Sequence, residues 1–217
     1  MRYRCDKGMD KHAYTRLYET LFHGFREDQL KFVELGLQIG GPEHHRDACR
    51  ETTDLPSVRM WLDYFPKAQI IGADVSDFSW FQHERFQFVP CDMDDRKNFQ
   101  ALKVATENAR VIIDDASHAS AHQQFGLLEL FPALSEQGLY IIEELQWQPK
   151  SYEDKHRHYP KTARLFRNYL RDGFFTHPVR DVEDQLNAIA ADFASVFLFQ
   201  QNYHPAAIAK VAVIHKK

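Results

Sequence analysis

Short apolar runs rich in valine and isoleucine alternate along the chain with segments whose apolar residues recur every three or four positions. Buried parallel strands have the first pattern and amphipathic helices have the second. We therefore expect an α/β protein. The predicted strands lie at residues 31–35, 69–73, 86–90, 110–113 and 139–142, and the predicted helices at about 10–25, 56–65, 96–107, 120–131 and 162–171.

The chain closes with two more apolar runs, FASVFLFQQNY and IAKVAVIHKK. The connection between them is too short for a crossover helix, so we expect an antiparallel hairpin. All the runs together predict a seven-stranded, mostly parallel sheet with one antiparallel C-terminal strand and helices on both faces. No linker or repeat divides residues 1–217, which predicts a single domain.

The predicted strands end in acidic residues or run into glycines. The residues are Glu34, Gly36, Gly40 and Gly41 after the first strand, Asp74 after the second, Asp92 after the third, Asp114 and Asp115 after the fourth, and Glu143 and Glu144 after the fifth. One such acid alone more often caps a helix or faces solvent, as we expect for Asp94 and Asp95. The carboxyl ends of parallel strands share one edge of the sheet, where α/β proteins bind ligands, so the series as a whole predicts a site.

The composition excludes some classes of function without naming one. An apolar fraction of 44%, a charged fraction of 27% and a formal net charge of −4 give no electrostatic footprint for nucleic acid or an anionic membrane. Three widely spaced cysteines form neither a disulfide framework nor a zinc pattern, and no apolar run approaches the length of a membrane span. We expect a cytoplasmic protein.

The glycine loop followed by acids at successive strand ends resembles the class I S-adenosylmethionine-dependent methyltransferases, over nearly the whole chain. This resemblance implies a Rossmann-like methyltransferase fold with S-adenosylmethionine as cofactor. It implies that residues 36–41 lie beside the methionine part, that Asp74 binds the ribose, and that Asp92 and Met93 border the adenine. The other residues that we assign to the cofactor are Glu34, Asp114 and Ser57, the last of which is also the expected N-cap of the helix at 56–65.

Three local patterns are similar to those of the metal-dependent sugar O-methyltransferases of macrolide biosynthesis. They are DKHAYTRLYETLF, PSVRMWLDYFP, and VIIDDASH paired with LYIIEEL, and a cephalosporin-hydroxylase-like family shares the last pair. The resemblance implies that Asp115, Glu143 and Glu144 hold Mg²⁺ or another divalent cation, that Asp115 is thereby catalytic, and that His118 is the general base. Ala116 and Glu144 depart from the family, which commonly has Gly and Asp at these positions. The longer Glu144 could alter the geometry of the metal.

The expected function is therefore a magnesium-dependent O-methyl transfer to a hydroxyl of a small molecule, a sugar or a glycosylated secondary metabolite. We expect no nucleic-acid or membrane partner, and self-association remains open. Acceptor specificity should reside in an N-terminal helical lid segment, residues 1–28, in the loop at 42–56 and in a lid loop at 145–161, because long polar loops in compact domains are often functional.

Four other interpretations stay open. The scaffold could carry a metal-dependent hydroxylase or hydrolase, or a non-catalytic cofactor-binding protein. A nicotinamide dehydrogenase is disfavoured because the chain has no G-x-G-x-x-G motif. His118 and His122 have the spacing of helical zinc ligands, but the H-E-x-x-H pattern is absent, so His122 is expected to be structural or to line the pocket.

Overall fold

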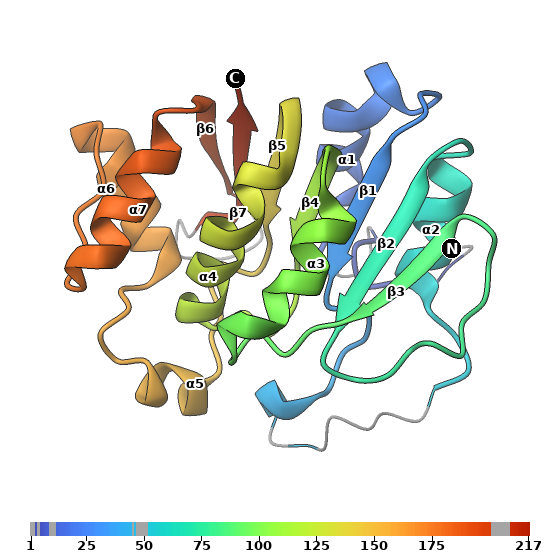
Figure 1. The fold of residues 1–217 in the computed structure, drawn as a ribbon, viewed down its shortest axis with the longest axis horizontal. Coiled ribbons are helices and arrows are strands. Elements are labelled where there is room, and N and C mark those ends of the chain that lie inside the picture. Colours follow the sequence, from blue (N-terminus) through green and yellow to red (C-terminus); the bar gives the residue numbers. More distant parts are fainter. Residues whose placement is uncertain (1–2, 4, 9–11, 45, 47–51, 201–208) are drawn as a thin grey trace.

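A twisted sheet of seven strands forms the centre of the molecule (Figure 1). The computed structural model describes residues 3, 5–8, 12–44, 46, 52–200 and 209–217. The strand order is β3-β2-β1-β4-β5-β7-β6. The strands are β1 (Lys31–Leu35), β2 (Gln69–Asp74), β3 (Phe86–Pro90), β4 (Ala109–Asp114), β5 (Leu134–Ile142), β6 (Phe193–Gln200) and β7 (Ala209–Lys216). The pairs among β1 to β5 are parallel, and β7 is antiparallel to both β5 and β6, which confirms the predicted topology and the C-terminal hairpin.

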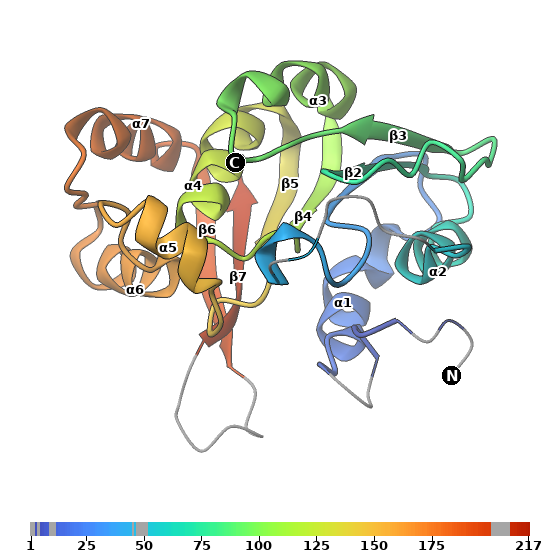
Figure 2. The ribbon, with the colours of Figure 1, turned by 90° about the horizontal axis from the view of Figure 1, so that it is seen from below.

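Helices cover both faces of this sheet (Figure 2). They are α1 (Thr15–Phe22), α2 (Pro56–Tyr64), α3 (Phe99–Thr106), α4 (Ser120–Leu130), α5 (Lys150–Lys155), α6 (Thr162–Asp172) and α7 (Arg180–Ala190). One apolar core packs α1 and α2 against the sheet, and the core on the other face includes α3, α4, α6 and α7. Successive strand residues enter opposite cores, as Phe32 and Val33 do, which explains why these strands read as continuous apolar runs.

Four predictions about local structure are corrected. The segment at 96–107 is a 3₁₀ turn, Arg96–Asn98, followed by α3, and β5 begins five residues earlier than the apolar pattern indicates, at Leu134 rather than residue 139. Helices α5 and α7 were not predicted. Ser57 is not an N-cap, because α2 begins at Pro56, whose fixed backbone suits the first helical turn, and the hydroxyl of Ser57 donates instead to Glu34. Within the described ranges, no helix is long and apolar enough to cross a membrane.

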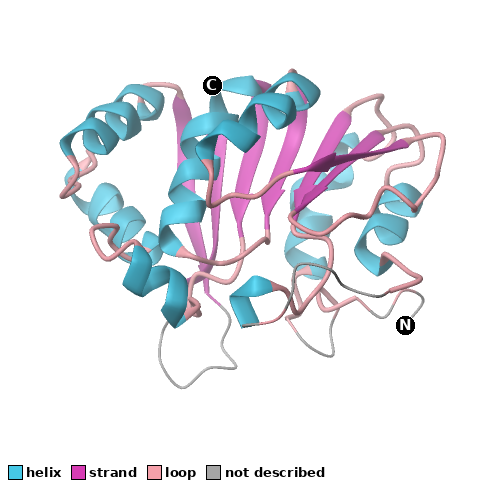
Figure 3. Cartoon of the chain, turned by 60° about the horizontal axis from the view of Figure 1, so that its bottom comes forward, coloured by secondary structure: helices cyan, strands magenta, loops and turns pink. Residues whose placement is uncertain are grey.

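The carboxyl ends of the parallel strands converge on one edge of the sheet. Helix α5 and the short 3₁₀ helix Pro42–His44 both lie on this side (Figure 3). The ring of Trp147, just before α5, stacks on the ring of His44, with 5.2 Å between the centroids. Segments that are far apart in sequence therefore enclose this edge.

Candidate functional site

Two adjoining pockets open at the carboxyl edge of the sheet. The first, which we call the Asp74 pocket, encloses about 530 Å³ and is lined by residues that include Asp74, Asp92 and Met93. The second, the Asp115 pocket, encloses about 1010 Å³ and is lined by residues that include Asp115, His118 and Glu144. Both volumes include space that is open to solvent. The two pockets share Gly36, Gln38 and Ala116, so they meet where the loops after β1 and β4 touch.

Gly36 lies where these two loops approach each other closely. Its backbone has φ +82°, and a Cβ atom there would lie 2.2 Å from the carbonyl oxygen of Asp115. Gly36 N donates to Ala73 O at 2.8 Å, and Asp115 N donates to Leu35 O at 2.9 Å. Only glycine satisfies both the left-handed backbone and the close approach. Gly40 also has a positive φ of +91°, but neither it nor Gly41 lines the two pockets.

Asp74 fixes the wall of the first pocket. Its side chain is buried; Oδ2 accepts from Leu37 N and Oδ1 from Ser76 N, each at 2.8 Å. The carboxylate thus holds the loop after β1 against the end of β2. Because Asp74 lines this pocket, its carboxylate would border a ligand that binds there. Asp92 is exposed beside it, and buried Met93 supplies an apolar surface.

Lys7 is the unexpected residue of the second pocket. Its Nζ atom lies 2.6 Å from Asp115 Oδ2, 2.8 Å from Glu143 Oε1 and 3.5 Å from Glu34 Oε1, and the side chain is 1% exposed. Burial would lower the pKa of Lys7, but these carboxylates outweigh it and hold that pKa well above its ordinary value. A single cationic atom therefore already lies between the side chains of Asp115 and Glu143.

Two tyrosines of the N-terminal region hold the glutamates that follow β5. Tyr14 donates to Glu144 Oε1 at 2.5 Å, and Tyr18 donates to Glu143 Oε1. Burial and the nearby charge of Asp115 raise the pKa of Glu143 well above its ordinary value. Both tyrosine side chains are buried in the same core as the sheet, so α1 forms part of the wall of the site as well as part of the fold.

His118 lies beside Asp115, with 3.9 Å between Nδ1 and Oδ1. It has φ +60°, and its ring meets the edge of Trp147 at 5.6 Å between centroids. No described residue hydrogen-bonds to its buried Nδ1. The imidazole therefore lines the second pocket with a ring nitrogen, Nδ1, that has no hydrogen-bond partner among the described residues. It does not form a zinc pair with His122, whose two ring nitrogens contact Ser117 and Asp94.

The donor set of the second pocket fits a divalent cation in part. Asp115 and Glu143 both direct a carboxylate oxygen at the one atom Lys7 Nζ, and carboxylates are the hard ligands that Mg²⁺ prefers. Glu144 is instead held by Tyr14, and among the described side chains the three acids do not bring their oxygens within 4.8 Å of one another. A divalent ion could bind Asp115 and Glu143 only if the ammonium of Lys7 withdrew.

Besides Gly40 and Gly41, three more residues assigned to the cofactor do not line the Asp74 pocket. Glu34 is fully buried and accepts from Ser57 Oγ at 2.8 Å and from Trp61 Nε1 at 3.0 Å, so this pair lies at the base of the Asp115 pocket. Asp114 lines neither pocket. Its side chain turns into the core, where a Cβ on Gly126 would lie 3.1 Å from Asp114 Oδ2, and burial raises the pKa of Asp114 to about 7. We therefore do not retain Asp114 as a cofactor contact.

Asp94 is expected from the sequence only as a helix N-terminal acid, and its role in the structure is different. Asp95 caps the turn Arg96–Asn98 as predicted, by accepting from Lys97 N. Asp94 Oδ1 instead lies 3.2 Å from His122 Nε2 and 2.9 Å from His156 Nε2, and Asp94 Oδ2 pairs with Lys155. Because His156 belongs to the predicted lid loop, no local pattern could have joined it to Asp94.

In fold, the chain is similar to a solved methyltransferase. Its structure aligns with that of MycE methyltransferase from the mycinamycin biosynthetic pathway in complex with Mg, SAH and mycinamycin VI. The TM-score is 0.73 at 24% identity, over 99% of this chain and 52% of that chain. A second structure of MycE, with Mg and SAH, aligns with a TM-score of 0.74 at 23% identity. The predicted fold class is confirmed.

In sequence, the chain is similar to sugar O-methyltransferases. It is 35% identical over 142 residues to 8-demethyl-8-alpha-L-rhamnosyl tetracenomycin-C 2'-O-methyltransferase of Streptomyces olivaceus, covering 64% of this chain and 35% of that protein. It is 31% identical over 144 residues to mycinamicin VI 2''-O-methyltransferase of Micromonospora griseorubida, covering 66% and 34%. No protein-family model matches. The resemblance inferred from the motifs is thus confirmed, and the chain spans about a third of the length of these curated relatives.

Proposed function

We propose that this chain carries an S-adenosylmethionine-dependent O-methyltransferase activity toward a hydroxyl of a sugar or glycosylated small molecule. The observation that carries the proposal is the junction of the two pockets at Gly36. A cofactor bound in the Asp74 pocket and an acceptor bound in the Asp115 pocket would have their reacting groups next to each other. Holding two reactants in contact is itself a large part of catalysis.

The residues of the chain have separable roles in this reaction. Asp74 accepts from the ribose hydroxyls, and Met93 packs against the base. His118 takes the proton of the acceptor hydroxyl at an imidazole nitrogen. When bound, the cofactor supplies the methyl group, and Mg²⁺ held by Asp115 and Glu143 supplies the positive charge that makes the hydroxyl more acidic.

The direct test is a screen for methyl transfer. Protein, isotopically methyl-labelled S-adenosylmethionine and Mg²⁺ are incubated with a panel of glycosylated polyketides that includes mycinamicin VI, the substrate named for one relative. Mass spectrometry should detect a labelled methyl group on one of these acceptors and equimolar S-adenosylhomocysteine. Metal-dependent turnover of a panel member without consumption of the cofactor would favour the hydroxylase or hydrolase interpretation instead.

Cofactor binding can be tested without an acceptor. We expect Asp74→Asn to raise the dissociation constant of S-adenosylhomocysteine by roughly ten- to a hundredfold in calorimetric titration, because a hydrogen bond to a charged acceptor is worth about 1.5–3 kcal/mol. Asp77→Asn is the matched control, since exposed Asp77 also accepts from a backbone amide in the same loop but lines neither pocket. Equal dissociation constants for the Asp74 variant and the wild type would contradict the assignment.

Lys7 and a divalent cation should compete for the same carboxylates. We expect Lys7→Met to tighten Mn²⁺ binding by at least about tenfold, measured by electron paramagnetic resonance, because the metal no longer displaces an ammonium ion. Without metal, the variant should melt at a lower temperature than the wild type, and Mg²⁺ should restore the loss. Lys103→Met is the control, because Lys103 pairs with Glu129 outside both pockets. An unchanged Mn²⁺ affinity would show that Lys7 does not occupy the metal position.

A further inference from the structure

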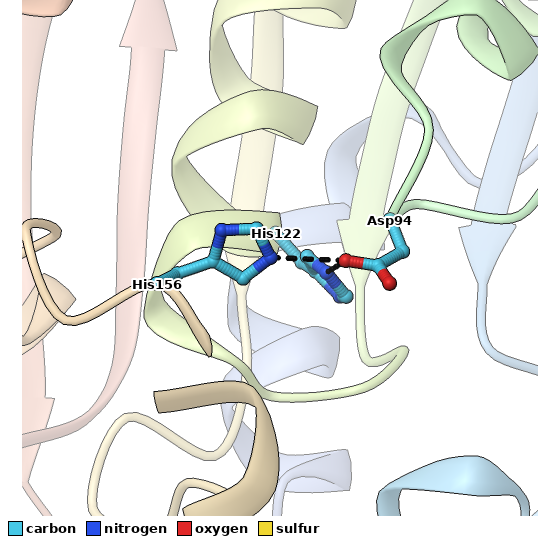
Figure 4. A group of neighbouring side chains, drawn as sticks. All are labelled: Asp94, His122 and His156. Atoms are coloured by element: carbon cyan, nitrogen blue, oxygen red, sulfur yellow. Dashed lines mark hydrogen bonds and ion pairs between the residues drawn. The ribbon is translucent and has the colours of Figure 1, made fainter. Parts of the chain in front are cut away.

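The side chains of Asp94, His122 and His156 meet beside the Asp74 pocket (Figure 4). They come from three separate elements: the turn after β3, the first turn of α4, and the end of α5. His122 Nε2 lies 3.2 Å and His156 Nε2 2.9 Å from the same atom, Asp94 Oδ1. The three ligand atoms all lie within 4.8 Å of one another, and they are the one such His, Cys, Asp and Glu group found across the described part of the chain.

We propose that Asp94, His122 and His156 bind a divalent transition-metal ion of the Zn²⁺ type. An ion bound tetrahedrally at 2.0–2.1 Å from each ligand sets its ligand atoms about 3.3 Å apart. The two separations between nitrogen and oxygen, 3.2 and 2.9 Å, are already close to this value. The third separation, between the two histidine nitrogens, is within 4.8 Å.

The surroundings of the cluster suit a metal. Ser117 Oγ lies 2.7 Å from His122 Nδ1 and can accept a hydrogen bond from the Nδ1–H group. This hydrogen bond would leave Nε2 without a proton and able to bind the metal, and a ligating histidine is usually supported in this way. Aromatic rings shield the group from water: the ring of Tyr152 lies 4.7 Å from that of His122, and the ring of Phe125 lies 5.9 Å from that of His156. Lys155 pairs with the other carboxylate oxygen of Asp94, Oδ2, and leaves Oδ1 to the histidines.

The ligand types separate this site from the Asp115 pocket. Two imidazoles and one carboxylate suit Zn²⁺, Co²⁺, Ni²⁺ or Fe²⁺, whereas Mg²⁺ prefers the all-oxygen set of Asp115 and Glu143. Three protein ligands also leave a coordination position open. Because His122 and Tyr152 line the Asp74 pocket, the ion would lie at the wall of that pocket. The metal would fasten the lid loop at residues 145–161 to α4 at the wall of that pocket.

The test is metal binding by the intact protein after removal of metal with a chelator. Co²⁺ is titrated in saturating Mg²⁺, which occupies the Asp115 pocket, and we expect visible absorption bands of low-symmetry Co²⁺ that saturate at one ion per chain. Zn²⁺ should bleach these bands, and bound Zn²⁺ should raise the melting temperature. Absence of the bands, or saturation only at several ions per chain, would overturn the proposal.

Variants locate the ion. His156→Gln should weaken Zn²⁺ binding by about a hundredfold or more, since a lost ligand costs at least as much as a lost supporting residue. The side chain of His156 is partly exposed, so this variant should leave the core intact, and Asp94→Asn provides a second loss of a ligand. His158→Gln is the matched control, because His158 is an exposed histidine two residues away on the same loop. Equal Zn²⁺ affinity of His156→Gln and His158→Gln would refute the site.

The outcome of these metal-binding tests does not depend on whether the proposed methyl transfer is correct. Asp115→Asn should leave the Co²⁺ bands unchanged, whereas His156→Gln should leave Mn²⁺ binding in the Asp115 pocket unchanged. Loss of the Co²⁺ bands in the Asp115 variant would place the ion in the Asp115 pocket and would also overturn the inference.

Discussion

Replacing Asp115 with asparagine is expected to abolish methyl transfer while the dissociation constant of S-adenosylhomocysteine stays within a few-fold of the wild-type value. Asp115 directs one oxygen at the cation position and lies beside His118, so its charge serves both the metal and the base. Loss of one preorganised electrostatic group in a desolvated site typically costs a factor of about 100 to 1000 in kcat. The rate is measured with the acceptor that the mass-spectrometric screen identifies, and Mn²⁺ binding is measured in parallel.

Two comparisons make this result specific. Asp95→Asn removes a carboxylate that only caps a turn, and it should leave kcat unchanged. Melting curves show whether Asp115→Asn still folds, which we expect because Lys7 keeps its contact with Glu143. If Asp115→Asn turned over at the wild-type rate in the presence of a chelator, neither the carboxylate nor a metal would take part in the reaction.

The sheet could be predicted because its central strands, such as β1 and β4, are buried on both faces. Strand β1 has the predicted bounds, since its apolar run coincides with the buried segment, and β3 has them too, although only Val89 of β3 is buried. Strand β5 extends beyond its apolar run because its first half, which includes exposed Glu136 and Gln137, lies at the margin of the sheet. Helix α7 buries only Val182 and Leu186, and the rest of its sequence is mostly polar.

The site could be predicted only where strand ends determine it. Asp74 and Asp115 line the pockets because each lies at the carboxyl end of a parallel strand, and the sequence predicts these positions. The adjacent Asp114 turns into the core, because successive residues point to opposite sides and the pattern does not show which of the pair faces the pocket. Lys7 reaches Asp115 across 108 residues of sequence, a contact that no local pattern encodes.

Replacing Gly36 with alanine should disrupt both pockets at once. The new Cβ would lie 2.2 Å from the carbonyl oxygen of Asp115 and 2.6 Å from Ala116 Cα, and both are backbone atoms that cannot rotate away. The positive φ adds a strain of about 1–2 kcal/mol for a residue with a side chain. With the overpacking, we expect a loss of at least about 3 kcal/mol in the free energy of unfolding, or roughly 10 °C in Tm.

Two other glycines separate the causes of this loss. Gly173 has φ +79°, but a Cβ atom there would have no neighbour within 4 Å, so Gly173→Ala should show the backbone strain alone. Gly24 has neither feature, so Gly24→Ala should be nearly neutral or slightly stabilising. The expected order of Tm is therefore Gly24→Ala above Gly173→Ala above Gly36→Ala, and only the last should also weaken S-adenosylhomocysteine binding. If Gly36→Ala were no worse than Gly173→Ala in both measurements, the contact between the loops after β1 and β4 would not be what joins the two pockets.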